Sequence, residues 1–106
     1  MHPPIETNPD SLLVAAQAGT SGCLSRLLQL YSNYLRLLAC SQLDERLRAR
    51  VSPSDIVQET LFEAHRDFDR FVGRSSGEFV GWLRTILVHN LARMVEHHLL
   101  TGKRDV

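Results

Sequence analysis

The sequence predicts an all-α fold, a compact bundle of about four helices. Apolar residues recur at three- and four-residue spacing in several long segments, as they do on the buried side of an amphipathic helix. No segment shows the two-residue alternation of a half-buried strand. The prolines and most glycines lie near the N-terminus or between the apolar segments, which are therefore uninterrupted. With 106 residues, the chain is sized for one domain.

Composition indicates a soluble protein. Apolar residues make up 43% of the chain and charged residues 23%, the balance of a globular rather than a disordered protein. No apolar run approaches the roughly 18 residues of a membrane span. The N-terminus lacks the basic and apolar segments of a secretory signal, so we expect a cytoplasmic protein. Cys23 and Cys40 are expected to be buried thiols, since two cysteines are too few for a disulfide framework.

The first helix follows a proline-containing N-terminal segment. Residues 1–9 hold three prolines and are expected to form a flexible leader, which leaves residues 10–106 as the domain. Asn8 or Asp10 can cap a helix through the next apolar run, and Gly19 is placed to end it.

The second helix is longer and restarts the chain at Thr20 or Ser21. It carries one apolar stripe: Leu24, Leu27, Leu28, Tyr31, Leu35 and Leu38. Residues 41–51 are polar and basic around two leucines, and we expect them to form a short helix or a turn.

The third helix has a full set of start signals. Ser52 stands at the N-cap, Pro53 at the first helical position, and Asp55 three residues after the cap. The helix is expected to end near Arg70, ahead of Gly73. Its expected buried stripe is Val57, Leu61, Ala64 and Phe68.

A loop at residues 72–77 leads into the last helix. Ser75 and Glu78, three residues apart, form a second capping box. The helix is expected to run from about residue 77 to about residue 100, with Gly102 as its terminator. Its expected core stripe is Val80, Leu83, Leu87, Leu91, Met94 and His98.

Phe62 is out of place on the third helix. At about 100° per residue, its ring falls opposite the buried stripe. Its neighbours there are polar: Asp55, Gln58, Glu59 and Arg66. An aromatic residue ringed by polar groups is typical of a hot spot, which favours a protein-binding surface. The alternative is an ordinary solvated face, because isolated apolar residues are common on surfaces.

Trp82 lies off the core stripe of the last helix, near cationic and amide side chains: Arg84, His89, Asn90 and Arg93. A ring stacks on an unpaired base, an amide reads a base edge, and basic groups meet phosphate, so this face is a candidate nucleic-acid site. Alternatively, Trp82 packs on a neighbouring helix. The net charge of zero counts against nucleic-acid binding, because domains that bind nucleic acid are usually basic.

Charge differs between the two candidate segments. Residues 51–78 hold three basic and six acidic side chains, whereas residues 79–106 hold four basic and two acidic ones. This asymmetry is small, but it indicates two different surfaces.

No catalytic or metal-binding pattern stands out. The sequence has no glycine-rich phosphate loop, no Cys/His nucleophile arrangement and no obvious acidic pair, so we expect neither enzyme activity nor a cofactor. The spacing of His89, His97 and His98 does not fit a two-ligand helical metal site. A binding function is therefore the better prediction.

Three segments together resemble one protein family. Residues 55–64 (DIVQETLFEA) resemble region 2.2 of bacterial RNA polymerase sigma factors. Residues 79–92 (FVGWLRTILVHNLA) resemble regions 2.3 and 2.4, and residues 18–35 are similar to regions 1.2 and 2.1. The likeness is closest to the extracytoplasmic-function class and covers roughly residues 10–104. The two motifs are specific in combination, although neither is specific alone.

The resemblance implies a promoter-recognition subunit of RNA polymerase that acts in transcription initiation. Region 2.2 would dock on the clamp helices of the polymerase β′ subunit through Asp55, Gln58, Glu59, Phe62 and Arg66. Regions 2.3 and 2.4 and the loop before them would recognise and melt the −10 promoter element and capture the single-stranded non-template strand. The implied DNA-binding residues are Arg74, Ser75, Ser76, Trp82, Arg84, His89, Asn90, Arg93, His97, Lys103 and Arg104. Binding energy would be spent on unstacking bases, not on covalent chemistry.

The chain departs from the family pattern in two places. The family often has a run of basic residues at the end of this helix, but here Glu96 intervenes and the basic tail is only Lys103 and Arg104. Arg93 and Met94 stand where the family commonly has an acidic residue. The sequence stops where region 2 stops, without region 4, so we expect one domain of a longer protein, monomeric when free. The resemblance also implies an anti-sigma factor as a regulatory partner.

The alternative function is a helical interaction or adaptor module that never touches DNA.

Overall fold

All regular structure in the described part of the chain is helical. The computed structural model describes residues 8–104, with side chains for residues 8–99. The elements are α1 (Pro9–Gln17), α2 (Cys23–Gln42), α3 (Glu45–Arg48), α4 (Pro53–Arg66), the 3-10 helix η1 (Phe68–Arg70) and α5 (Ser76–Arg104). The prediction of an all-α bundle is confirmed. Most of the expected leader, residues 1–7, lies outside the described residues.

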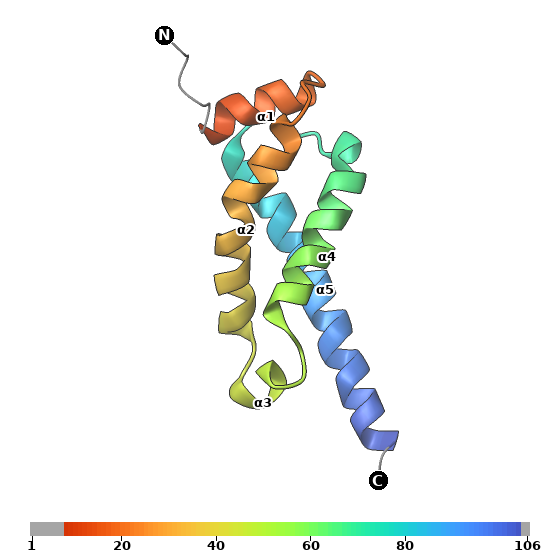
Figure 1. Ribbon diagram of the computed structural model, residues 1–106. Helices are drawn as coiled ribbons and strands as arrows, with labels where there is room; N and C mark the ends of the chain where they lie inside the picture. Colours follow the sequence, from red (N-terminus) through yellow and green to blue (C-terminus); the bar gives the residue numbers. More distant parts are fainter. Residues whose placement is uncertain (1–7, 105–106) are drawn as a thin grey trace.

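Three long helices form the body of the bundle. α4 packs against both α2 and α5, and α1 packs mainly on α2. In Figure 1, α1 lies across one end of the bundle, α3 lies at the other end, and α5 extends beyond the other helices at its C-terminus. The core residues come from α1, α2, α4 and α5, and Leu43 and Val51 add to the core on either side of α3. Each fully buried leucine, such as Leu12 or Leu35, contributes about 1.5–3 kcal/mol by leaving water.

The start of α1 is set by Asn8 and Pro9. The side-chain oxygen of Asn8 accepts hydrogen bonds from the backbone N–H groups of Asp10 (2.9 Å) and Ser11 (3.3 Å). Pro9 is the first residue of the helix rather than the last residue of the leader. A proline is tolerated there because its missing N–H would have no partner within the helix.

Two glycines make the turn between α1 and α2. Gly19 and Gly22 have φ angles of 84° and 80°, in the left-handed region that glycine adopts without strain. α2 begins at Cys23, with Gly22 as its N-cap and no capping side chain, so the predicted restart at Thr20 or Ser21 is wrong by one or two residues.

Both α3 and α4 begin at a side-chain cap. The Asp44 carboxylate accepts a hydrogen bond from the backbone N–H of Leu47 (2.9 Å), which starts the short helix expected in this segment. The Ser52 hydroxyl oxygen accepts from the backbone N–H of Asp55 (3.3 Å), with Pro53 as the first helical residue. The start signals of the third helix are thus confirmed.

α4 is shorter than expected, and its buried side is wider. Arg70 does not end this helix, because the backbone tightens into η1 first. Ile56 and Thr60 are fully buried, although the predicted stripe omitted both, whereas Leu61 and Phe68 are only half-buried. The reason is that α4 lies between α2 and α5, so two of its sides are covered.

α5 begins at the predicted capping box and ends later than predicted. The Ser75 hydroxyl oxygen accepts from the backbone N–H of Glu78 (3.1 Å) and donates to the Glu78 carboxylate (3.2 Å). The helix continues through Gly102, so the predicted terminator is wrong. Among its side chains up to residue 99, the fully buried ones are Phe79, Leu83, Leu87 and Asn90. The buried stripe of α5 therefore starts at Phe79, one residue before the predicted Val80. Four residues of the predicted stripe are only half-buried: Val80, Leu91, Met94 and His98.

Two further expectations concern the membrane and the cysteines. Among the described residues, no helix combines the length and the apolar character that a bilayer span needs. Cys23 and Cys40 are free thiols on α2. Both are half-buried, so the expectation of buried thiols holds only in part.

Candidate functional site

Five α4 side chains that the sequence singled out share one exposed side of the helix. They are Asp55, Gln58, Glu59, Phe62 and Arg66, together called the α4 surface. The Phe62 residue is 62% exposed, and the Arg66 guanidinium carbon lies 5.9 Å from the centroid of its ring. The helix therefore brings the whole predicted set together in the open.

Arg66 is held near Phe62 by Asp67, the residue that follows α4. The Nε and Nη2 atoms of Arg66 donate to the two carboxylate oxygens of Asp67 at 3.0 and 2.9 Å. These hydrogen bonds lower the pKa of Asp67 below its usual value. Phe62 and Arg66 thus present an apolar ring and a positioned cation side by side.

A shallow groove between α2 and α4 adjoins the α4 surface. Gln58 and Leu61 line it from α4, and α2 contributes Gln29, Asn33 and Arg36. These three α2 residues belong to none of the predicted sites. Their three- and four-residue spacing was an available signal, but only helix packing decides which side of α2 lies next to α4.

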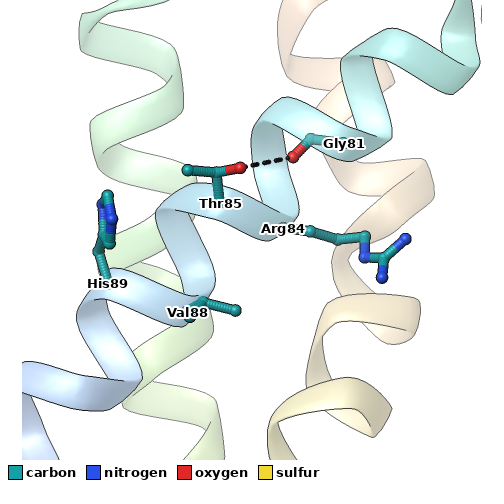
Figure 2. A pocket seen from close by; sticks show the side chains of 5 residues that line it. All are labelled: Gly81, Arg84, Thr85, Val88 and His89. Carbon is teal, nitrogen blue, oxygen red and sulfur yellow. Dashed lines mark hydrogen bonds between the residues drawn. The ribbon is translucent and has the colours of Figure 1, made fainter.

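A shallow hollow on the outer side of α5 is lined by two predicted DNA-binding residues. Arg84 and His89 line it together with Gly81, Thr85 and Val88. Figure 2 shows the Arg84 and His89 side chains pointing away from each other. The Thr85 hydroxyl donates to the Gly81 carbonyl oxygen (3.0 Å), which keeps it against the helix backbone. The two basic side chains therefore flank the hollow and leave its centre open.

Trp82 is part of an aromatic cluster. Its ring centroid lies 5.3 Å from that of Phe71, 5.7 Å from Phe79 and 6.5 Å from Phe68. The residue is half-buried, and these contacts join the start of α5 to η1 and the following loop. The alternative interpretation, in which Trp82 packs on its neighbours, fits this geometry. Trp82 therefore contributes to the packing of the fold.

Asn90 lies buried between α4 and α5, with 1% of its surface exposed. Its Nδ2 donates to Thr60 Oγ1 (3.1 Å) and lies 3.5 Å from Glu63 Oε2. The prediction that Asn90 reads a base edge is corrected, because its amide is enclosed and bonded inside the bundle. Arg93, by contrast, is exposed and forms an ion pair with Glu63 (3.3 Å).

The loop before α5 is fastened to α1. The Gln17 side-chain Nε2 donates to the Gly73 carbonyl oxygen (2.8 Å), and the Ser76 backbone N–H donates to Asp10 Oδ1 (2.8 Å). Tyr31 of α2 also interacts with Ser76. Burial raises the pKa of Tyr31, with Asp10 adding to the rise and the Ser76 hydrogen bond opposing it.

The remaining predicted DNA-binding residues lie apart from one another. Arg74 is exposed in the loop, while the Ser75 hydroxyl is engaged as the cap of α5. His97 is exposed near the far end of the helix. The side chains of Lys103 and Arg104 lie outside the described residues. In the described part of the chain, no three His, Cys, Asp or Glu side chains gather closely enough to hold a metal ion.

Two exposed surfaces on adjacent helices are thus available for partners. A scan against protein-family models found no match, and neither did comparisons with curated proteins and with solved structures. The α4 surface combines an aromatic ring with acidic and amide groups, as protein-binding sites do. The exposed part of α5 carries arginine and histidine, which suit an anionic ligand.

Proposed function

We propose that this chain is the region 2 domain of a bacterial sigma factor, which binds the polymerase β′ clamp helices and recognises and melts the −10 promoter element. The proposal rests on the resemblance of residues 55–64 and 79–92 to regions 2.2 and 2.3–2.4. The observation that carries it is the exposed Phe62 ring within the α4 surface. Exposed aromatic anchors surrounded by polar groups dominate the energy of many protein interfaces.

The two surfaces have separate partners in this proposal. The α4 surface binds the clamp helices. The exposed part of α5 and the loop before it bind the single-stranded non-template strand of the promoter. Arg74, Arg84 and Arg93 meet phosphates, because all three are exposed cations. Asn90 is left out of this set because it is buried. These contacts offset the cost of unstacking a base, roughly a few kcal/mol.

Truncation of Phe62 tests the polymerase half of the proposal. Phe62→Ala should weaken binding to a purified β′ clamp-helix fragment by at least about tenfold, as the loss of a hot-spot aromatic does. Leu37→Ala is the matched control, because Leu37 on α2 is 63% exposed and lies outside the α4 surface. Both variants should keep the wild-type melting temperature, since both side chains are exposed. Wild-type clamp affinity of Phe62→Ala would sink the polymerase half.

A helical adaptor that never contacts nucleic acid is the second candidate. The packing of Trp82 and the burial of Asn90 favour it, because they engage two predicted base-contacting groups within the fold. Binding of single-stranded −10 DNA to the chain together with polymerase core separates the two functions. With a sigma domain present, the core enzyme should bind the −10 strand in a sequence-dependent way. With an adaptor present, its binding of this DNA should not change.

A further inference from the structure

Arg93 on α5 is exposed but not free. Its side chain is 66% exposed, yet its Nη2 atom contacts two acceptors. One acceptor is Oδ1 of Asn90, one turn earlier on α5, and the other is Oε1 of Glu63 on α4, at 3.3 Å. These groups border a shallow hollow between α4 and α5, lined by Glu63, His89, Asn90, Ala92, Arg93 and Glu96.

The two acceptors act differently on Arg93. Asn90 is neutral, and its bond to Thr60 fixes it inside the bundle, so it sets the position of the guanidinium without changing the local charge. Glu63 carries the opposite charge, at a distance longer than the roughly 2.7–2.9 Å of a strong charge-assisted bond. Glu63 therefore screens the charge of Arg93 through a weak contact that a ligand can replace.

We propose that Glu63 is an internal competitor for the anion that Arg93 binds, and that this anion is a phosphate group of single-stranded nucleic acid. On binding, a phosphate oxygen replaces the Glu63 carboxylate at Nη2, while Asn90 keeps its contact. A guanidinium group accepts this exchange because it binds phosphate and carboxylate with the same donor geometry. Asn90 is then a positioning residue, and Glu63 lowers the affinity for the strand. The inference rests on the proposed function and adds a control on its DNA-binding surface.

The surroundings of Arg93 favour a flexible polyanion as the ligand, because Arg84 adds a second exposed cation on α5. His89 lines the hollow beside Arg93 and also the hollow beside Arg84 that Figure 2 shows. At about 100° per residue, Arg84 and Arg93 lie on different sides of α5, so a path that joins them through His89 curves around the helix. A single strand can bend along such a path, whereas a short duplex is too stiff to do so.

Glu63→Gln tests the competition directly. Glutamine keeps the size of the side chain and can still bond to Asn90, but it no longer neutralises Arg93. Binding of a short single-stranded DNA oligonucleotide, followed by fluorescence anisotropy at low salt, should tighten by up to about fivefold, the upper range for one exposed ion pair. Glu96→Gln is the matched control, because Glu96 lines the same hollow and Arg93 forms its ion pair with Glu63 instead. It should give a smaller gain, through overall charge alone.

Arg93→Gln separates a specific exchange from a general charge effect. In this background, Glu63→Gln should bring no more gain than Glu96→Gln does, because the cation that Glu63 screened is gone. Equal gains from the two glutamate variants in the wild-type background would overturn the proposal. So would an extra gain from Glu63→Gln that persists without Arg93.

Two further outcomes have distinct meanings. If a poly-glutamate peptide gains as much from Glu63→Gln as the oligonucleotide does, Arg93 serves an acidic protein partner and the proposal is wrong. Failure of the proposed function looks different, since the wild-type chain would then bind neither the single strand nor the clamp fragment. Melting temperatures of Glu63→Gln and Glu96→Gln should stay within about 4 °C of the wild-type value, which excludes unfolding as the cause.

Discussion

Thr60 and Asn90 place a polar bridge in an otherwise apolar core. The Thr60 hydroxyl donates to the Ile56 carbonyl oxygen (2.8 Å) and accepts from Asn90 Nδ2 (3.1 Å). Among the described residues, no buried side-chain nitrogen or oxygen lacks a hydrogen-bond partner. Removing only one of the two groups is expected to destabilise the fold most, because the remaining buried group then has neither a hydrogen-bond partner nor access to water.

Replacing Thr60 by valine keeps the shape of the side chain and removes its oxygen. Thr60→Val should lower the free energy of unfolding by about 1–3 kcal/mol, since Asn90 loses its buried acceptor. Thr85→Val is the matched control, because Thr85 bonds the carbonyl four residues earlier in the same way but is exposed. Its replacement should change the free energy by no more than about 0.5 kcal/mol. Urea denaturation measures both, and equal losses would contradict the structural role of the bridge.

At the scale of elements, α1 helps to start α5. The first backbone N–H groups of a helix have no partner within it, and Asp10 supplies one for Ser76 from another helix. A carboxylate at this end also interacts favourably with the helix dipole. Gln17 holds the Gly73 carbonyl in the same loop, so α1 fixes the approach of the chain to α5.

Removing Asp10 tests this contact between helices. Asp10→Ala should lower the free energy of unfolding by about 0.5–2 kcal/mol, the usual cost of a lost cap. The Ser76 amide should exchange its hydrogen faster, because it loses its acceptor. Ser11→Ala, at the next exposed position of α1, is the control and should leave this amide unchanged. Unaltered exchange at Ser76 in Asp10→Ala would show that the contact contributes nothing.

At the scale of the whole molecule, Tyr31 lies where three helices meet. It belongs to α2, and its ring centroid is 6.0 Å from that of Phe79 on α5. The Asp10 carboxylate of α1 helps to raise its pKa. Burial raises its pKa above the usual 10.0. The unfolded chain therefore releases this proton at a lower pH than the folded chain does. The stabilisation from neutral Tyr31 is complete below about pH 10 and is lost as pH rises through the folded pKa.

Tyrosine variants isolate this pH dependence. The wild-type urea midpoint should fall as pH rises above about 10, because ionisation of Tyr31 is favoured in the unfolded state. Tyr31→Phe should remove that part of the fall, whereas Tyr34→Phe, at an exposed position of α2, should retain it. The same fall in all three proteins would assign the effect to other groups.

Local sequence signals predicted more of this structure than long-range ones did. The caps at Ser52 and Ser75 lie where expected, because each depends on residues three positions away. The α4 surface around Phe62 was also predictable, since helical periodicity alone puts its members on one side. The burial of Asn90 was not, because its partner Thr60 lies 30 residues away.

The sequence by itself determined the helical class, most helix starts and the exposure of Phe62, because capping and periodicity act within a few residues. Only the tertiary structure decided the roles of Asn90, Trp82 and Glu63. Asn90 became a bridge between α4 and α5, Trp82 joined an aromatic cluster, and Glu63 met Arg93 across the interface of the two helices. The physical reason is that burial and ion pairing depend on which sides of two helices come together, and helix packing settles that only when the bundle forms.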